Sequence, residues 1–531
     1  MKKRFIRTIS VLVVAVMALA ACQPAAQPTP APDAGNGNQA ETPADGAVAG
    51  MDELIVVTPS MPSGLDPAGL NENPGAQIRS QIFETLVIRN PRTLEIEPWL
   101  AESWDFEDPQ TLHMTLRSGV YFSNGDPLTM EDVLLTFERI KESTHVRVFY
   151  EHIERIEVHD DRNLTFHLSV PFVPILTHLH HQSSGIINAR NARELLGDNI
   201  HDLTDYHVGT GPFKFEQLIT GDRTIITRND NWWGGAVPMS RVTFRVVPEG
   251  TTRLIEVETG SADIALAIDH FDVSRAEGTP GVVMHRNPNF SYNYIGINTR
   301  QGALGDVRVR QAINYALDMQ AIVDNAFFGV GVPATGPLVY GRHHFATRVD
   351  PQPPNLERAR ELMAEAGFAD GIEIYFHTNA GNQSRADVAV MVQNMLRDID
   401  IDVTVEILEW TTYLDLTAEG EESYLFMLGW VSNPEPHGSL YNLFHSSTFG
   451  APGNRSFHSN DRLDYLLDLG STVLDPAERA VIYAEIQEII REELPHIPVQ
   501  HDEERNVSTE RVGGFYSNPM GHPRFWEVYF R

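Results

Sequence analysis

Histidines are the first residues of this sequence that could carry metal or catalytic chemistry. Three of them cluster in the segment THLHHQ, at His178, His180 and His181, and His343 stands next to His344. Zinc sites need a second group of ligands at a recognisable spacing, and neither group has one. We therefore expect packed or solvated histidines, and we predict no metal and no cofactor.

The common catalytic motifs are absent from the sequence. It contains no G-x-S-x-G elbow, no G-x-x-x-x-G-K-[ST] phosphate loop and no H-E-x-x-H helix. Carboxylates are abundant, but the sequence alone cannot pair two of them across a cleft, as glycoside hydrolysis requires. We predict that the protein is not an enzyme. A secreted hydrolase with an unrecognised site is the rival hypothesis.

The first 22 residues predict export. Basic residues precede an apolar run over 11–21, which is shorter than the roughly 20 residues of a membrane-spanning helix. The run ends at Leu19-Ala20-Ala21-Cys22, which looks like the cleavage and lipidation signal of bacterial lipoproteins. Cys22 is the only cysteine, so no disulfide is expected. We expect a membrane anchor through lipid on Cys22; an ordinary signal peptide is the alternative.

Residues 23–50 are rich in Pro, Ala, Gly and Gln and hold few bulky apolar side chains. Such a segment cannot bury enough surface to fold, so we expect a disordered tether. Folded sequence is expected over 51–531. A chain of that length exceeds a single core, and two or three domains are predicted.

The sequence is strongly acidic, with a formal net charge of -32 at pH 7. Proteins that track nucleic-acid phosphates need a basic face, so nucleic-acid binding is excluded. The charge has two possible roles. One is solubility in a harsh exterior, and the other is attraction of cationic solutes.

Strands and helices alternate between about residues 300 and 500, which predicts an α/β lobe. The expected helices of this part cover 306–328 (two helices), 355–368, 385–399 and 475–495, and the strands cover 292–299, 371–378, 401–408 and 496–501. The first half is richer in strands, expected at 52–60, 111–119, 163–171, 223–229 and 241–248, with a helix at 128–143 that Thr129 caps.

Five segments together resemble one protein family. They are residues 97–140, 208–235, 260–266 and 307–338, and the stretch GWVSNPEPHGSLYNLFHS at 429–446. In this order they resemble the extracytoplasmic solute-binding proteins of the dipeptide/oligopeptide/nickel class (family 5), which serve ABC importers.

The resemblance implies a two-lobed α/β fold of the periplasmic-binding-protein type that buries its ligand between the lobes. It places lobe one at 51–299, with an extra subdomain at about 88–206, and lobe two at 300–499. The chain should cross between lobes near Thr299 and return near Gln500, so that 500–531 rejoins lobe one and 525–530 adds a strand there. A ligand-closed monomer should then dock on the permease subunits in the membrane.

The family also suggests which residues read the ligand. Arg385 matches an arginine that grips the ligand carboxylate in dipeptide binders, through two parallel hydrogen bonds. Asn433 stands where peptide-binding members place an aspartate for the ligand's α-ammonium group. Glu435 could substitute for that acid, or the match could slip by a residue or two.

The other pocket candidates are aromatic or amide residues. They are Trp430, Trp410, Tyr413, Tyr292 and Asn293. The leading hypothesis is thus a lipid-anchored, extracytoplasmic receptor for a peptide-like solute. Glutathione-like or modified peptides, opines, oligosaccharides and nickel or other metal chelates are the alternative ligands.

Overall fold

The computed structural model describes residues 52–69, 72–197, 206–421 and 424–531. The predicted signal peptide, the lipidation site at Cys22 and the tether lie outside these residues. Within the described part, no helix combines the length and the apolar character that crossing a membrane would require.

Lobe two is built on the C-terminal part of the sheet. Its strands run in the order β15 (Ile401–Leu408), β14 (Ile372–Asn379), β16 (Tyr424–Val431), β12 (Val282–Ile297) and β17 (His496–Thr509), with β13 (Val332–Pro333) paired to β17. Strands β14, β15 and β16 are parallel, whereas β12 is antiparallel to both β16 and β17. The carboxyl ends of the three parallel strands therefore meet at one edge.

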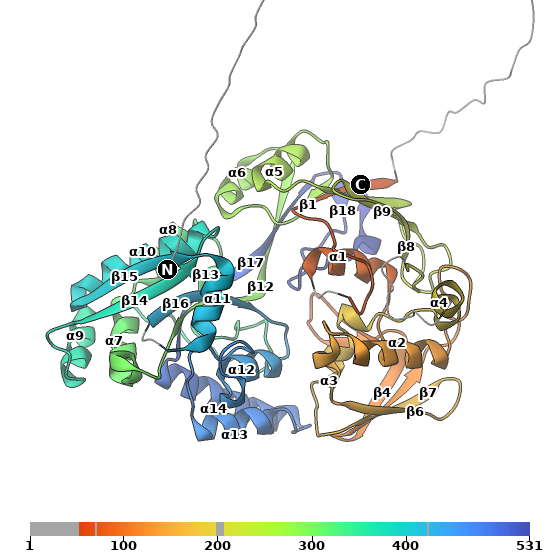
Figure 1. The fold of residues 1–531 in the computed structure, drawn as a ribbon. Helices are drawn as coiled ribbons and strands as arrows, with labels where there is room; N and C mark the ends of the chain where they lie inside the picture. The colour runs from red at the N-terminus through yellow and green to blue at the C-terminus, as the bar shows by residue number, and fades with distance from the viewer. Residues whose placement is uncertain (1–51, 70–71, 198–205, 422–423) are drawn as a thin grey trace, which may run out of the picture. The chain divides into compact units, whose positions relative to one another are not determined.

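Eight helices described in this lobe surround its strands. They are α7 (Val307–Ala316), α8 (Met319–Ala326), α9 (Leu356–Glu365), α10 (Gln383–Leu396), α11 (Trp410–Glu419), α12 (His437–Phe444), α13 (Asp461–Gly470) and α14 (Pro476–Glu493). Helix α10 packs on β14 and β15 (Figure 1). Its buried face, with Val388, Val392 and Leu396, joins Phe376 and Val403 of the strands in one core.

Local sequence signals set the helix starts. Capping side chains at Asp306, Asp318, Asn355 and Asp475 accept hydrogen bonds from the first-turn amides of α7, α8, α9 and α14. In α2 (Met130–Glu142), Thr129 and Asp132 form a capping box. These predicted helix starts are confirmed.

Lobe one continues the same sheet beyond β17. Its strands run in the order β11 (Ile264–Ala265), β1 (Glu53–Thr58), β10 (Arg241–Val246), β9 (Arg223–Arg228) and β8 (Phe213–Ile219), and its helices include α1 (Asn73–Ile82), α5 (Gly250–Glu258) and α6 (Val273–Gly278). Strand β1 is parallel to β10 and β11, while β9 is antiparallel to both of its neighbours, β10 and β8.

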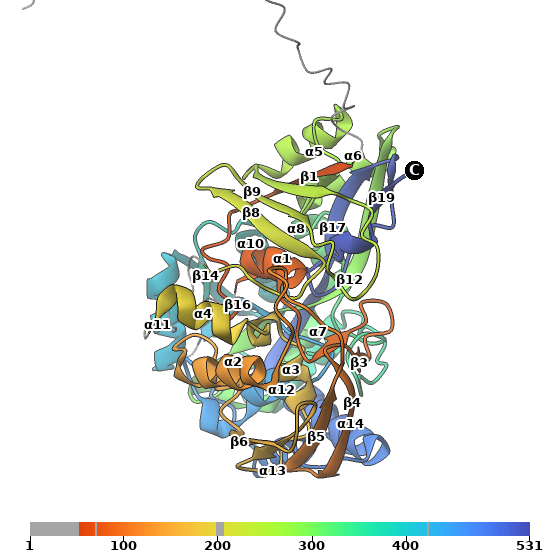
Figure 2. The ribbon, with the colours of Figure 1, turned by 90° about the vertical axis from the view of Figure 1, so that its right-hand side faces the viewer.

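A second, four-stranded sheet forms the subdomain of the first lobe. Its order is β4 (Ala101–Asp108), β5 (Thr111–Leu116), β7 (Asn163–Leu168) and β6 (Ile153–Val158), beside the pair β2 (Val87–Arg89) and β3 (Ile96–Pro98) and the helices α2, α3 (Ile175–Leu179) and α4 (Ala189–Leu196). Figure 2 shows α2 beside this sheet, where Val133, Phe137 and Ile140 pack on Leu112 and Phe166. We propose this unit as the extra subdomain.

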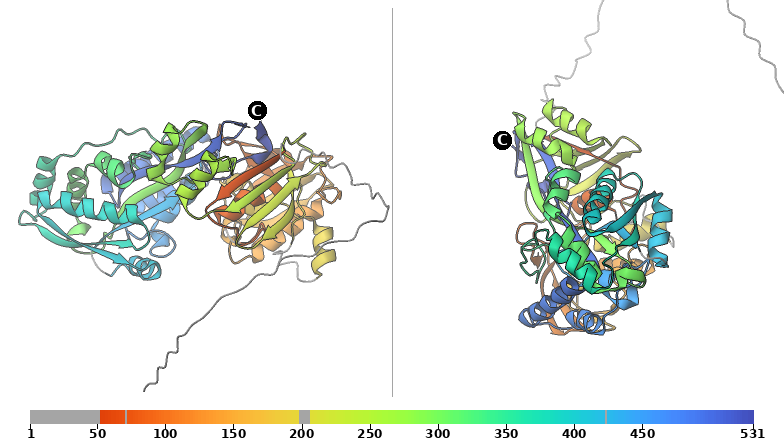
Figure 3. Two further views of the ribbon diagram at one scale, coloured as in Figure 1. Left: turned by 90° about the horizontal axis from the view of Figure 1, so that it is seen from above. Right: turned by 90° about the vertical axis from the view of Figure 1, so that its left-hand side faces the viewer.

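Two long strands join the lobes. Strands β12 and β17 lie side by side, in green and blue in Figure 3, and their register is interrupted between Pro288 and Tyr292 and again between Asn293 and Tyr294. Residues of β12 before the first interruption pack with lobe one, and those after it pack with lobe two. We therefore propose that the chain crosses at this interruption, before Thr299, and returns near Gln500.

The C-terminal tail differs from the long strand that was expected over 525–530. It forms a short 3-10 helix, Phe525–Glu527, and only the two-residue strand β19 (Tyr529–Phe530), which pairs with β18 (Val512–Gly513). Phe525 and Val528 enter the core of lobe one instead. The tail thus contributes buried side chains more than backbone pairing.

Two adjacent tryptophans, Trp232 and Trp233, pack against the core. The indole N–H groups of Trp232 and Trp233 each donate to one oxygen of Glu84, at 2.9 Å. The Trp99 ring meets Trp233 edge-on at 4.9 Å. Burial raises the pKa of Glu84 to about 7, because the indole hydrogen bonds offset only part of the lost hydration.

The first glycine of the segment GTGPFKF allows two backbones to touch. A Cβ placed on Gly209 would overlap the carbonyl of Ile82, at the end of α1. We expect Gly209→Ala to lower the free energy of unfolding by about 3 kcal/mol, because a backbone cannot move aside as a side chain can. Denaturant unfolding would measure this. Gly278→Ala is the control, since a Cβ there meets nothing within 4 Å. Equal stability of the two variants would contradict the prediction.

Candidate functional site

The carboxyl edge of the lobe-two sheet gathers most of the side chains proposed for ligand binding. The parallel strands β14, β15 and β16 end there at Asn379, Leu408 and Val431. Ligands of open α/β sheets bind outside the carboxyl ends of the strands. The position of this edge therefore marks it as the candidate site.

Gly429 is the centre of this site. The residue opposite it on β12 is Asn293. A Cβ on Gly429 would lie 2.8 Å from Oδ1 of Asn293 and 3.3 Å from Nη2 of Arg385. The missing side chain thus lets an amide and a guanidinium approach the same stretch of backbone, which brings together two of the residues predicted from sequence.

Further amides hold these two side chains in place. Arg385 donates from Nη1 to Oδ1 of Asn379 at 2.8 Å, and Asn293 donates to Oε1 of Gln500 at 2.8 Å. Gln500 in turn donates to the carbonyl of Val330. Asn379 and Gln500 were not predicted as site residues. Gln500 reaches the site through the register of β12 with β17, which the sequence does not display, whereas Asn379 lies only six residues before Arg385.

Arg385 is the main charge of the site. It lies in the first turn of α10, whose N-cap residue is Asn382. Among the described residues, no carboxylate forms an ion pair or hydrogen bond with it. Burial lowers its pKa, and the neighbouring Tyr413 and Tyr294 oppose that shift. A partly buried guanidinium without an anionic partner is suited to receive an anion.

The aromatic candidates divide into buried and accessible rings. Tyr292, opposite Trp430 on the neighbouring strand, is 2% exposed, and Tyr413 is fully buried and donates its hydroxyl to the carbonyl of Met427 at 2.6 Å. Trp410 is 44% exposed, and its ring lies 6.0 Å from that of Tyr413. Trp430 is half-buried. Trp410 and Trp430 are therefore accessible to a ligand, whereas Tyr292 and Tyr413 are not.

The turn after β16 holds Asn433 and Glu435 in different environments. Oδ1 of Asn433 accepts the backbone N–H of Glu435 at 2.9 Å. Glu435 is buried, and its two oxygens accept hydrogen bonds from Arg479 at 2.7 and 3.2 Å. The sequence could not reveal this pairing, since Arg479 lies on a helix that follows much later in the chain.

Residues of the subdomain contact lobe two near this turn. The ring of Phe172 meets that of His437 edge-on at 5.7 Å, and the Val173 N–H donates to the Ser471 carbonyl at 2.8 Å. Arg89 lies in the field of Glu435; burial lowers the pKa of Arg89 to about 10, and the Glu435 charge opposes that shift. These contacts join residues that are far apart in the sequence.

The histidines serve packing and hydrogen bonding. His180 accepts from Arg89 at 3.2 Å, and His181 caps a 3-10 turn through the backbone N–H of Ser183. His178 hydrogen bonds to the carbonyl of Phe149, and His343 contacts Ser432. Across the residues that the structure describes, no group of three His, Cys, Asp or Glu side chains could hold a metal ion.

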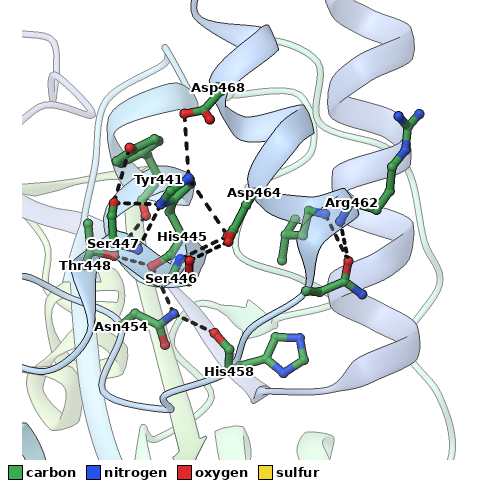
Figure 4. A network of polar contacts seen from close by, with 12 residues as sticks. Tyr441, His445, Ser446, Ser447, Thr448, Asn454, His458, Arg462, Asp464 and Asp468 are labelled. Atoms are coloured by element: carbon green, nitrogen blue, oxygen red, sulfur yellow. Dashed lines mark hydrogen bonds and ion pairs between the residues drawn. The ribbon is translucent and has the colours of Figure 1, made fainter.

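A serine, a histidine and two aspartates meet at the end of α12, in an arrangement that could suggest a hydrolase. Ser447 Oγ lies 2.6 Å from Nδ1 of His445, whose Nε2 lies 3.6 Å from Asp468 and 4.0 Å from Asp464 (Figure 4). However, the same Nδ1 accepts the backbone N–H of Ser447 at 3.0 Å. The imidazole therefore caps a 3-10 turn, which explains the cluster without catalysis.

A pocket of about 350 Å³ opens elsewhere in lobe two. It is lined by parts of α7, α9 and α14 and by the segment after β13, and it includes Tyr315, Met319 and His496. None of the side chains assembled around Gly429 lines it. We therefore keep the carboxyl edge as the candidate site.

The comparison with protein families decides the class. The sequence model described as "Bacterial extracellular solute-binding proteins, family 5 Middle" matches residues 95–451. The chain belongs to this family. Family 5 proteins are extracytoplasmic solute receptors of ABC importers, so the class predicted from the sequence is confirmed, and so is the receptor role.

Individual family 5 relatives are similar in sequence to nearly the whole chain. Heme-binding protein A of Haemophilus influenzae is 28% identical, covering 97% of this chain and 98% of that protein. The glutathione-binding protein GsiB of Salmonella typhi is 26% identical, and the match covers 88% of this chain and 92% of that protein.

A solved family 5 structure shows the same fold. The periplasmic binding protein DppA of Helicobacter pylori, in complex with peptide STSA, is 27% identical, with a TM-score of 0.73 and coverage of 90% of this chain and 98% of that one. The predicted two-lobed α/β fold is confirmed.

Proposed function

We propose that this receptor captures a peptide-like solute that bears a carboxylate, between its two lobes, and delivers it to the permease of an ABC importer. The observation that carries the proposal is Arg385, a guanidinium at the carboxyl edge without an anionic partner among the described residues. The amides of Asn293 and Asn379 beside it can supply further hydrogen bonds to a peptide.

The relatives support a ligand of this kind. One is a glutathione-binding protein, and a solved neighbour holds a peptide; both ligands carry carboxylates. Heme, named for a third relative, carries them as well. Oligosaccharides are a weaker alternative, because a neutral sugar would leave Arg385 without a counter-charge. Nickel or other metal chelates remain an alternative where the chelator carries a carboxylate.

We propose that closure over the ligand uses the contacts between the subdomain and lobe two. Phe172 with His437, and Val173 with Ser471, join the lobes at a point distant in sequence from the strands that connect them. A ligand that bridges the lobes would favour this arrangement through its contacts with both. The receptor acts as a monomer without catalysis, held at the membrane by lipid on Cys22.

Replacing Arg385 tests the proposal. We expect Arg385→Ala to weaken binding of a carboxylate ligand about 100-fold, because a charge-assisted bidentate contact is lost in a partly buried site. The ligand would first be identified by mass spectrometry of protein purified from its host, and its affinity then measured by calorimetry.

Arg397→Ala is the matched control, since Arg397 follows the same helix and is exposed. It should leave the affinity unchanged. If Arg385→Ala binds the ligand as tightly as this control does, Arg385 does not belong to the site.

A further inference from the structure

The charges at the carboxyl edge of lobe two are unbalanced. Arg385 contributes a positive charge, and the groups nearest to it are the neutral amides of Asn379 and Asn293 and the tyrosines 294 and 413. Among the described residues no acidic side chain hydrogen bonds to this guanidinium. A ligand that carries a negative charge would therefore complete the site.

Two acidic side chains lie close to this edge, and both have other partners. Glu435 is 8% exposed, and Arg479 holds both of its oxygens. Glu409 is exposed to solvent at the start of α11, where one oxygen caps the amides of Thr411 and Thr412 at 2.9 and 3.3 Å. Of the described residues, the two acidic side chains that follow the ends of β15 and β16, Glu409 and Glu435, therefore do not offer a cation a buried, unpaired carboxylate.

Asn433, in the turn that follows β16, does not supply such a charge. Its Oδ1 already accepts the N–H of Glu435, so the neutral amide can offer a cation one further hydrogen bond but no charge. An ammonium group enclosed beside it would lose its hydration and gain no counter-charge.

We infer that the ligand carries a carboxylate and no free ammonium group beside the Trp430–Asn433 segment, as in an N-acylated peptide or one whose amino end is joined in an amide. This inference rests on the proposed function, because it concerns the other end of the same ligand. It assigns Glu435 to the pair with Arg479, and not to the role of substitute acid that the sequence also offered.

The test is a competition between matched peptides. A soluble form of the protein that begins after the lipidation site, at residue 23, is freed of bound ligand and mixed with an equimolar pool of di- to tetrapeptides, half with free and half with acetylated amino termini. Mass spectrometry of the retained fraction gives the ratio of acetylated to free peptide. We expect a ratio of at least about ten, because an enclosed ammonium without a counter-charge binds poorly.

One substitution should abolish the preference for acetylated peptides. Asn433→Asp adds a carboxylate and keeps the oxygen that accepts the Glu435 N–H, so the turn is preserved. We expect the ratio to fall at least about tenfold, because the ammonium now has a partner. Asn325→Asp, at an exposed site on α8, adds the same net charge elsewhere and should leave the ratio unchanged.

The possible outcomes separate this inference from the proposed function. If the protein retains peptides at a ratio below ten, an ammonium is accommodated, and the inference is overturned while the peptide receptor stands. If no peptide of either kind is retained, the proposed function is overturned and the inference with it. If Asn433→Asp leaves the ratio unchanged, the segment does not face the amino end of the ligand, which also overturns the inference.

Discussion

Acidification from pH 7 to pH 4 is expected to unfold this protein, because buried histidines must take up protons to become charged. Burial lowers the pKa of His343 and His496 to about 3 and that of His437 and His501 to about 4, from an ordinary value of 6.5. The unfolded chain therefore binds protons first as the pH falls below 6.5, and stability is lost from there downward.

The size of the effect follows from the pKa shifts. A shift of one unit corresponds to about 1.4 kcal/mol, so each of the four histidines costs about 3 kcal/mol at pH 4. Together they match the total stability of a typical domain, about 5–15 kcal/mol. Circular dichroism across a pH series would follow the transition, which we expect between about pH 5 and pH 4.

Two buried carboxylates act in the opposite direction. The pKa of Glu84 and that of Glu504 are raised to about 7 by burial, so these groups bind protons in the folded state before the unfolded chain does. Their contribution to stability falls as the pH rises from 4.5 to 7, and acidification regains it. The four histidines outnumber these two carboxylates, so their effect on stability is larger. Below pH 4.5 the carboxylates are protonated in both the folded and the unfolded state and no longer change the stability. Acid therefore destabilises the protein.

His496 isolates this effect at one residue. Its ring stacks on Tyr294 at 3.9 Å, and neither ring nitrogen has a hydrogen-bond partner within the described chain. We expect His496→Phe to raise the free energy of unfolding by about 1 kcal/mol at pH 7, because two buried polar atoms disappear. At pH 4.5 the gain should grow by about 3 kcal/mol, because the variant no longer loses stability through proton uptake by this imidazole in the unfolded chain.

Urea unfolding at the two pH values would measure both gains. His145→Phe, at an exposed position, is the control and should leave the pH dependence as it is. A His496→Phe variant with the wild-type pH dependence would show that this imidazole is protonated in the folded state.

The second large effect concerns the buried pair of Glu435 and Arg479, whose side chains are 10% and 7% exposed. Arg479→Met would leave a buried carboxylate with a 3.3 Å hydrogen bond from the backbone N–H of His437 and the more distant charge of Arg89. We expect a loss of about 3–5 kcal/mol in the free energy of unfolding, which chemical denaturation would measure.

Two comparisons make this prediction specific. Adding Glu435→Leu to Arg479→Met removes the stranded charge and should restore most of the stability. Arg462→Met breaks an equally bidentate pair with Glu485, but these side chains are 52% and 42% exposed, so it should cost less than about 1 kcal/mol. If all three variants have the same free energy of unfolding, burial does not determine how much the Glu435–Arg479 pair contributes to stability.

Local signals in the sequence predicted the helices well. Thr129, Asp306, Asn355 and Asp475 cap helices where expected, because a capping side chain acts on amides only two or three residues away. Strand β4 was missed because its sequence, AESWDFED, is charged and mostly exposed and so lacks an apolar alternation. The tail was misjudged because Phe525 and Val528 read like strand residues but pack as single anchors.

The site was only partly predictable for a different reason. Arg385 and Asn293 were predicted from family resemblance, but their common neighbour Gly429 emerges only from the register of β12 with β16. The same holds for Glu435, whose partner Arg479 comes from another helix. Interactions between distant segments decide which charges are free, and a sequence does not show distant pairings.

The interruption in β12 and β17 has a mechanical consequence. In the crossing that we propose, two paired strands, and not two separate loops, connect the lobes, and the ladder is regular up to Pro288 and again from Tyr294. Bending can concentrate in the few residues that lack pairing, while every other backbone bond of the ribbon stays intact. The connection then works as a hinge that bends at one place in an otherwise continuous two-stranded ribbon. This connection restricts the direction in which the lobes can move. The facing surfaces of the two lobes should therefore return to the same alignment after each cycle of ligand capture and release.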